Sequence, residues 1–243
     1  MPLIVLPITP SDIRSVYDVY FSAFEGNVML EILFPMAFID GKITEEFRAG
    51  HATHQLEYLK STPLEHTLKC VDTDTNEIVG MAVYGVYFKE RQYDEYKSPS
   101  GCEWLEGQER KRCEKLLVPL WKKKEELLEG RPHVYCQVLA VDPKHQKRGI
   151  GALLMQWGID VAEKLKVPIY LESTLAAVRL YEKMGFDRVK GSVVQKPEIT
   201  GLDHDIEVPL FYKMPKSNPN FDFGHLKDKG YTHRTETRTR VMV

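Results

Sequence analysis

The chain of 243 residues carries 33 basic and 35 acidic side chains, a formal charge of −2, and 43% hydrophobic residues. This length suffices for one domain with a full hydrophobic core, and the near-neutral charge excludes a global field that would attract nucleic acid or an anionic membrane. An acidic ligand therefore needs a local binding site. The four cysteines have no CxxC spacing, which argues against a zinc ribbon and a disulfide-stapled secreted fold.

The N-terminal segment lacks a basic region, and Pro2 and Pro7 interrupt its apolar run. It therefore differs from a secretory signal peptide, and no apolar stretch reaches the length of a membrane span. We expect a cytoplasmic protein, with a nuclear location left open.

The first half of the chain is predicted to combine helices with a strand hairpin. Apolar residues at helical spacing follow the capping signal Thr9-Pro10, and the turn-forming residues 72–76 separate two strand-like runs. An apolar loop at residues 27–38 is expected to line a pocket or to cap the core. The expected elements are a strand over Leu3–Ile8, helices ending near Phe24 and over Thr44–Leu59, and strands over Thr67–Val71 and Ile78–Phe88.

A densely charged segment at about 89–132 is predicted to be a helical insertion. Its helix is expected over Trp104–Leu128 and is expected to break near Pro119, because proline removes a helical N–H. The apolar residues interleaved in it favour a solvated helix with one buried stripe, or a lid over a binding cleft.

The second half of the chain is predicted to contain a βαβ unit. Open α/β sheets usually bind ligands at the carboxyl ends of their strands, so the turn between the first strand and the helix is the candidate site. The expected elements are a strand over His133–Val141, a helix over Gly149–Lys166, a strand over Pro168–Glu172, a helix over Leu175–Met184 and strands over Phe186–Val189 and Glu207–Lys213.

The turn Gln146–Ala152 has the features of an anion-binding cradle. Free N–H groups at a helix start point outward and the helix dipole favours negative charge, while Gly149 and Gly151 let a pyrophosphate approach the backbone. Lys144, Lys147 and Arg148 add local positive charge. The spacing fits neither a Walker A loop nor the dinucleotide-binding GxGxxG.

This turn resembles the Q/R-x-x-G-x-G/A motif of the GNAT acetyltransferases, with Gln146, Gly149 and Gly151-Ala152 at the matching positions. Downstream, Leu180–Phe186 is similar to the L-Y-x-K-x-G-F end of the family's second cofactor-side element. The resemblance covers most of residues 3–214. It implies an α/β (α+β mixed) fold, the GNAT fold, with a central, mostly antiparallel sheet splayed in the middle and helices on both faces.

The resemblance also implies acetyl-CoA as co-substrate and no metal. Strand backbone would pair with the pantetheine arm, a backbone N–H near Leu139 would meet the oxyanion, and the amides of the turn would hold the pyrophosphate. The implied cofactor-binding residues are Leu139, Ala140, Val141, Gln146, Lys147, Arg148, Gly149, Ile150, Gly151, Ala152, Thr174, Ala177 and Tyr181.

Among catalytic residues, Tyr181 matches the tyrosine that protonates the departing thiolate as general acid in this family. The family's asparagine seven residues earlier is Thr174 here, and we assign it no catalytic role. The general base is open, because Tyr135 and Gln137 stand where family members often carry Glu or His. Glu172 and His133 are the candidates. His51 and His54 lack a third ligand and are expected to be solvated helix residues, so no metal is predicted.

The expected activity is transfer of an acetyl group from acetyl-CoA to a primary amine of a small molecule. Two alternatives stay open at this point: acetylation of a protein lysine or N-terminus, and a non-catalytic acyl-CoA-binding module. We expect one GNAT domain over residues 1–215 with the insertion at about 89–132, a C-terminal extension over 216–243, and a homodimer as one option. The expected partners are acetyl-CoA and an amine, with neither nucleic acid nor membrane.

Overall fold

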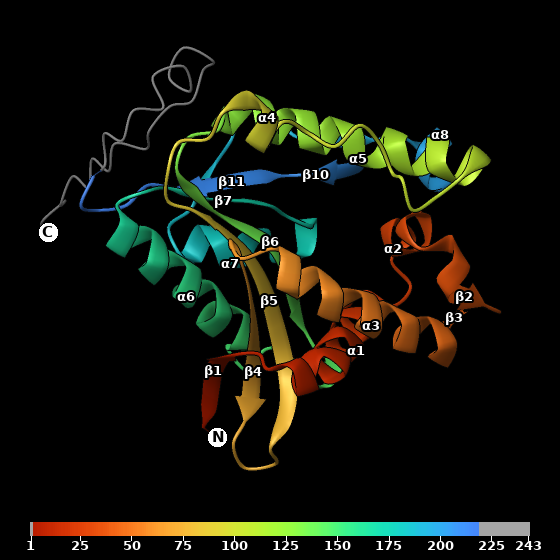
Figure 1. The fold of residues 1–243 in the computed structure, drawn as a ribbon, viewed down its shortest axis with the longest axis horizontal. Coiled ribbons are helices and arrows are strands. Elements are labelled where there is room, and N and C mark those ends of the chain that lie inside the picture. Colours follow the sequence, from red (N-terminus) through yellow and green to blue (C-terminus); the bar gives the residue numbers. More distant parts are fainter. Residues whose placement is uncertain (1, 219–243) are drawn as a thin grey trace, which may run out of the picture.

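The computed structural model describes residues 2–218, which form one seven-stranded sheet with helices on both faces (Figure 1). Every neighbouring strand pair is antiparallel except the parallel pair at the centre. The predicted fold class is confirmed. In spatial order the strands are β1 (Leu3–Pro7), β4 (Glu65–Asp72), β5 (Glu77–Tyr87), β6 (His133–Val141), β7 (Ile169–Glu172), β11 (Leu210–Lys213) and β8 (Asp187–Arg188).

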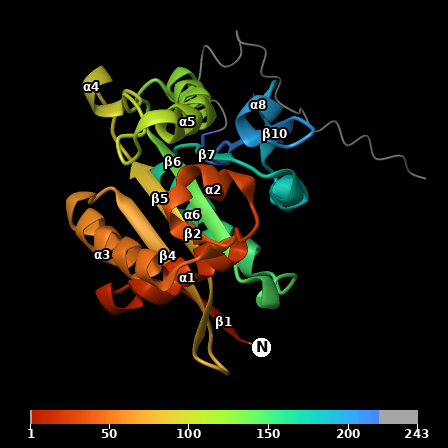
Figure 2. The ribbon, with the colours of Figure 1, turned by 90° about the vertical axis from the view of Figure 1, so that its right-hand side faces the viewer.

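The helices form two layers. One face of the sheet is covered by α1 (Ile13–Ala23), with α3 (Glu45–Ser61) packed on it, and by α5 (Gly107–Leu128); the opposite face is covered by α6 (Ile150–Leu165) and α7 (Val178–Lys183). Seen from the side, α2 (Val28–Leu33) lies in front of the sheet (Figure 2). The smaller elements are α4 (Tyr93–Tyr96), α8 (Pro197–Thr200), the pair β2 (Phe38–Ile39) and β3 (Lys42–Ile43), and the pair β9 (Val193–Gln195) and β10 (Ile206–Val208).

Strand alternation divides the core between these layers. On β5, Met81 and Val83 pack against Val16 and Val19 of α1. The alternate residues Ala82 and Tyr84 face the other way. The hydroxyl of Tyr84 donates to the Leu154 carbonyl of α6 over 2.9 Å. Burial of these side chains on both faces at roughly 25 cal/mol per Å² of apolar area supplies the main force that holds the layers together.

Most predicted elements of the core agree with the structure to within a few residues. The strand expected over Glu207–Lys213 is instead two strands, β10 and β11, which belong to different sheets and are separated by Pro209, a residue without an N–H for the ladder. The loop expected at residues 27–38 is instead α2 followed by a short 3-10 turn over Pro35–Ala37. The side chain of Asn27 caps α2 by accepting from the N–H of Met29 over 2.9 Å. The apolar character of this segment therefore comes from a packed helix.

The break expected near Pro119 was wrong, because α5 continues through this residue. Proline at 119 leaves the carbonyl four residues earlier, that of Lys115, without its helical donor. The next carbonyl, that of Leu116, is held from outside the helix: the buried Gln195 donates its Nε2 to it over 2.8 Å. Separate apolar clusters hold the two halves of α5, which also keeps it continuous.

The predicted insertion at about 89–132 holds α4 and α5. The division into a domain over 1–215 and an extension over 216–243 stays a prediction, because all but the first three residues of that extension lie outside the described residues. Of the helices in residues 2–218, none has the length and apolar character that a bilayer span requires.

Candidate active site

The two central parallel strands separate halfway along β6. Their pairing covers three residues of each strand and ends where Cys136 faces Leu171. At the next residue, Gln137, β6 bulges: Val138 pairs with Val83, and Cys136 with Tyr84, so Gln137 has no partner on β5. Because a bulge re-aims the side chains that follow it, the strand continues toward Val141 along an edge that β7 no longer covers.

A cleft of about 650 Å³ continues from this opening, between the second half of β6, the start of α6 and the segment before α7. All the predicted cofactor-binding residues line it except Arg148 and Tyr181. Phe24 and Asn27, at the end of α1 and the start of α2, line the opposite side together with Ala23. Sequence patterns did not identify these three, because their contribution depends on the path of the chain between two helices.

The turn that precedes α6 has an unusual backbone. Lys147 and Gly149 both adopt left-handed conformations, with φ of 62° and 82°. A Cβ at Gly149 would meet nothing within 4 Å, so its backbone conformation is what favours glycine there. At Gly151 a Cβ would lie 3.3 Å from Leu180 Cδ2. A turn of this kind at a helix start presents successive N–H groups to an anion.

Arg148 is turned away from the cleft. Its guanidinium donates to the buried carboxylate of Asp72 over 2.6 Å and to Nδ1 of His145 over 2.6 Å. This guanidinium is the main reason that the pKa of Asp72 is lowered. The contact ties the turn before α6 to the end of β4.

Tyr181 lies in the core beside the opening of the sheet. It is 5% exposed, and its ring packs against Phe186 and Phe211 at centroid distances of 5.7 Å. Burial raises the pKa of Tyr181, and the nearby Cys136 raises it further. Because Cys136 is the last paired residue of β6, this contact places Tyr181 near the point where β6 and β7 part.

The two candidate bases lie on the α5 side of the sheet. Burial raises the pKa of Glu172, against the opposing effects of Lys124 and of the Tyr135 and Tyr170 hydroxyls. His133 is fully buried, and its Nδ1 donates to the Arg131 carbonyl over 2.6 Å. Burial lowers the pKa of His133 to about 3.

A further carboxylate, Glu65, completes this side of the site and was missed by the sequence patterns. It accepts hydrogen bonds from Tyr58 over 2.9 Å and from the bulge residue Gln137 over 2.9 Å. Glu65 is the first residue of β4, where no motif marks it. The strand register brings it beside the bulge, and this places its carboxylate at the site.

His51 is not a solvated helix residue, as the sequence had suggested. It is half-buried among the rings of Tyr17, Phe21, Phe34 and Phe47, and burial lowers its pKa to about 4. In the part of the chain that the structure describes, no three His, Cys, Asp or Glu side chains are grouped to hold a metal ion.

The sequence profile of the acetyltransferase (GNAT) family matches residues 36–186. The chain belongs to this family. A protein of Ajellomyces capsulatus described as "Probable acyltransferase SID5" is 36% identical over 143 residues, which is 59% of this chain and 98% of that protein. Both findings support an acetyltransferase, so the predicted family and enzyme class are confirmed.

Solved structures agree on the fold. A mosquito arylalkylamine N-acetyltransferase-like 5b has a TM-score of 0.59 at 16% identity, and a Drosophila melanogaster polyamine N-acetyltransferase has 0.58 at 12% identity. Each comparison covers 88% of this chain and 100% of the other. At such identities the likeness shows the fold, and it leaves the acceptor of this acetyltransferase to be argued from its own residues.

Proposed function

We propose that this acetyltransferase moves an acetyl group from acetyl-CoA to a primary amine of a small molecule by direct attack. The observation that carries the proposal is the end of the β6–β7 pairing at Cys136 and Leu171, with the cleft beginning there. Backbone groups of Leu139, Ala140 and Val141 would pair with the pantetheine arm. The N–H groups of residues 147–152 would hold the pyrophosphate, with Lys147 adding charge at the cleft wall.

In this mechanism the amine nitrogen attacks the thioester carbonyl carbon, and a backbone N–H near Leu139 stabilises the oxyanion that forms. The C–S bond then breaks, and Tyr181 gives its proton to the departing thiolate. The electrostatic contact of Tyr181 with Cys136, the last paired residue of β6, supports this role. Burial raises the pKa of a thiol as it raises that of a phenol, so the two groups remain matched in a closed site.

Glu172 is the better candidate for the base that takes the amine proton. Its raised pKa favours proton uptake, and it follows directly after the last paired residue of β7. A histidine with a pKa of about 3 accepts protons poorly at neutral pH, which disfavours His133.

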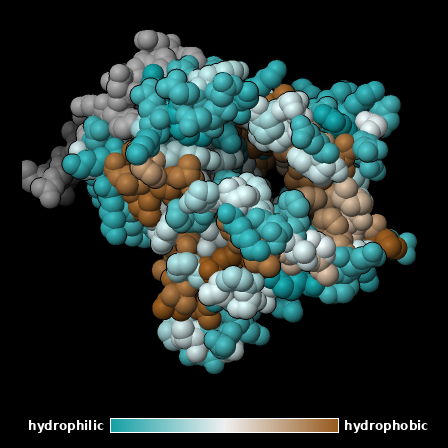
Figure 3. Space-filling model, viewed as in Figure 1, coloured by the Kyte–Doolittle hydropathy of each residue, from teal (hydrophilic) through white to brown (hydrophobic). Residues whose placement is uncertain are grey.

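Two features favour a small acceptor over a protein amine. Apolar side chains of α2 and α5, among them Ile32 and Leu116, pack together and hold α5 against the helix that begins beside the cleft, at Asn27. The surface is hollowed where α5, α2 and α3 meet, but α5 bridges above it (Figure 3). A protein substrate would need an open groove instead.

The homodimer also stays a prediction. The edge strand β1 exposes Ile4 and Leu6, which a second copy would cover.

Replacement of Tyr181 by Phe tests the mechanism. The variant is expected to lose about a hundredfold in kcat, because general acid catalysis contributes on this scale, while its Kd for acetyl-CoA stays within twofold. Stopped assays of free CoA release give kcat, and calorimetry gives Kd. Unchanged turnover in a correctly folded variant would remove Tyr181 from the mechanism.

A further inference from the structure

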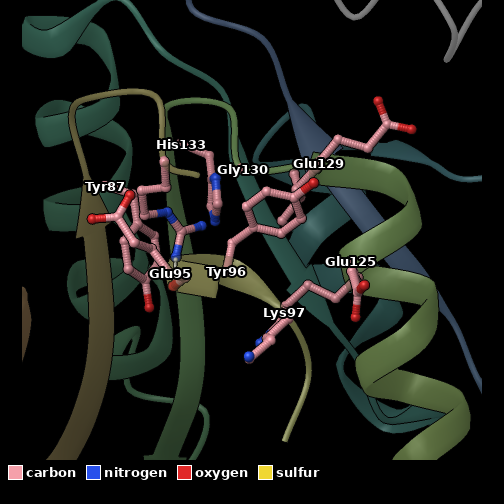
Figure 4. Close-up of a pocket in the computed structure, with 11 residues that line it drawn as sticks. Tyr87, Glu95, Tyr96, Lys97, Glu125, Glu129, Gly130 and His133 are labelled. Carbon is pink, nitrogen blue, oxygen red and sulfur yellow. Dashed lines mark hydrogen bonds between the residues drawn. The ribbon is translucent and has the colours of Figure 1, made fainter. Parts of the chain in front are cut away.

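A second cavity, of about 170 Å³, lies between α4, α5 and the start of β6. It shares no lining residue with the cofactor cleft. Figure 4 shows Tyr87 and His133 on the strands at its base and Glu125 and Glu129 on the α5 side. The cavity therefore lies on the same face of the sheet as Glu172 and Tyr135, on the side from which an acceptor would approach.

Arg91 enters this cavity and forms no ion pair with a carboxylate of the described residues, although Glu95 attracts it from farther away. Its guanidinium stacks 3.8 Å from the ring centroid of Tyr87, and its buried Nε has no hydrogen-bond partner. Its contact with the carbonyl of Glu95 is long, at 3.5 Å. Burial lowers the pKa of Arg91, which means that the cation is held where water solvates it poorly.

Lys124 of α5 lines the same cavity. Its ammonium lies 4.2 Å from the ring centroid of Tyr135, and burial is the main cause that lowers its pKa. Arg91 lowers this pKa further, because the two positive charges repel each other. Within residues 2–218 neither side chain forms an ion pair with a carboxylate, although Glu172 and Glu65 attract Lys124 from farther away.

The acidic side chains at the rim are held by other groups. Glu95 accepts from the N–H of Gln92 over 2.7 Å, and Glu125 from the N–H of Ser98 over 2.9 Å. Glu129 pairs with Arg131, and its carboxylate is turned out of the cavity (Figure 4). Two partly desolvated cations that form no ion pair with the carboxylates around them are costly, and an anion that binds between them reduces that cost.

The distance to the transfer centre limits the size of the ligand. His133 lies in the cavity and Tyr135, two residues along β6, adjoins both Lys124 and Glu172. Two strand residues span about 7 Å. A molecule with its amine at Glu172 and an acid group between Arg91 and Lys124 is therefore of amino-acid size.

We propose that the acceptor is a small amine that also carries a carboxylate, and that Arg91 and Lys124 bind this carboxylate. The inference rests on the proposed function, because it places the amine at the acetyl-transfer centre. Arg91 offers paired N–H donors that match a carboxylate, and Lys124 offers a second charge from the opposite wall.

The test compares three primary amines with the same six-carbon chain: ε-aminocaproate, its methyl amide and hexylamine. With the wild-type enzyme, kcat/KM for the acid is expected to exceed that for the methyl amide by about tenfold, the usual loss when a desolvated charged hydrogen bond is removed. In Arg91→Met and Lys124→Met this ratio is expected to fall close to one.

Two further variants control the test. Lys124→Arg keeps the charge and is expected to keep the preference for the acid. Lys97→Met removes a lysine that lines the same cavity but is 52% exposed and paired with Asp94, so its ratio is expected to match the wild type. Thermal unfolding of every variant reports whether it is folded.

The outcomes separate the inference from the proposed function. Equal rates for the acid and the methyl amide, or acetyl-CoA binding without transfer to any of the three amines, would overturn the inference. A wild-type enzyme that binds no acetyl-CoA would overturn the proposed function itself. An acid preference that survives in both Met variants would show that other residues bind the carboxylate.

Discussion

The proposed cofactor cleft and the proposed acceptor side are built in different ways. Most residues that line the cleft come from one continuous stretch, β6 with the turn and helix that follow it, and the others come from the segment before α7 and from residues 23–27. The acceptor side is made of side chains from separate elements: Glu65 of β4, Tyr135 of β6, Glu172 of β7 and Lys124 of α5. A local sequence motif can specify the first kind of site, whereas only the assembled fold specifies the second.

The largest expected effect concerns the acceptor side. Glu172→Gln removes the proposed base, and kcat/KM for the amine at pH 7 is expected to fall by about a hundredfold, the scale of general base catalysis. Affinity for acetyl-CoA should not change, since Glu172 does not line the cleft.

The pH profile sharpens this prediction. Because burial raises the pKa of Glu172, the wild-type rate should rise with pH through a value above that of an ordinary glutamate, as the protonated form loses its proton. This rise should disappear in Glu172→Gln and persist in His133→Gln. A rise that persists in Glu172→Gln but is lost in His133→Gln would transfer the base role to His133.

An intermediate effect is expected within the turn before α6, where the neighbouring cations Lys147 and Arg148 have different surroundings. Lys147 is exposed and lines the cleft, so Lys147→Met should raise the Kd for acetyl-CoA by about tenfold and leave the melting temperature unchanged. Arg148→Met should chiefly lower the melting temperature, because it leaves the buried Asp72 carboxylate without its partner. The reverse pattern would show that Arg148 meets the phosphates.

The smallest expected effect on activity concerns the support of α5. Gln195→Ala leaves the Leu116 carbonyl unpaired and should lower the free energy of unfolding by about 1–3 kcal/mol, measured by urea titration. In a Pro119→Ala background the loss should be about the same, because the restored N–H of residue 119 bonds the Lys115 carbonyl and not that of Leu116. A much smaller loss in that background would mean that Gln195 compensates for the proline.

Sequence patterns were sufficient for the parts of this fold that are local. The alternation in β4 and β5, the turn between them and the glycines before α6 predicted the sheet and the cleft wall. They failed at Pro119 and at residues 27–38, where a distant side chain and tertiary packing decide the conformation. Arg91, Lys124 and Glu65 carried no local signal, because their environment arises from contacts between elements far apart in the chain.

The most direct test of the account is a calorimetric titration of the protein with acetyl-CoA, beside a variant in which Gly149 and Gly151 are both replaced by Val. At Gly149 the left-handed φ of 82° opposes a branched residue, and at Gly151 the added atoms meet Leu180 and enter the cleft. We predict saturable binding to the wild type and none to the folded double variant. Failure of the folded wild-type protein to bind acetyl-CoA, or equal binding by both proteins, would contradict the assignment of the cleft.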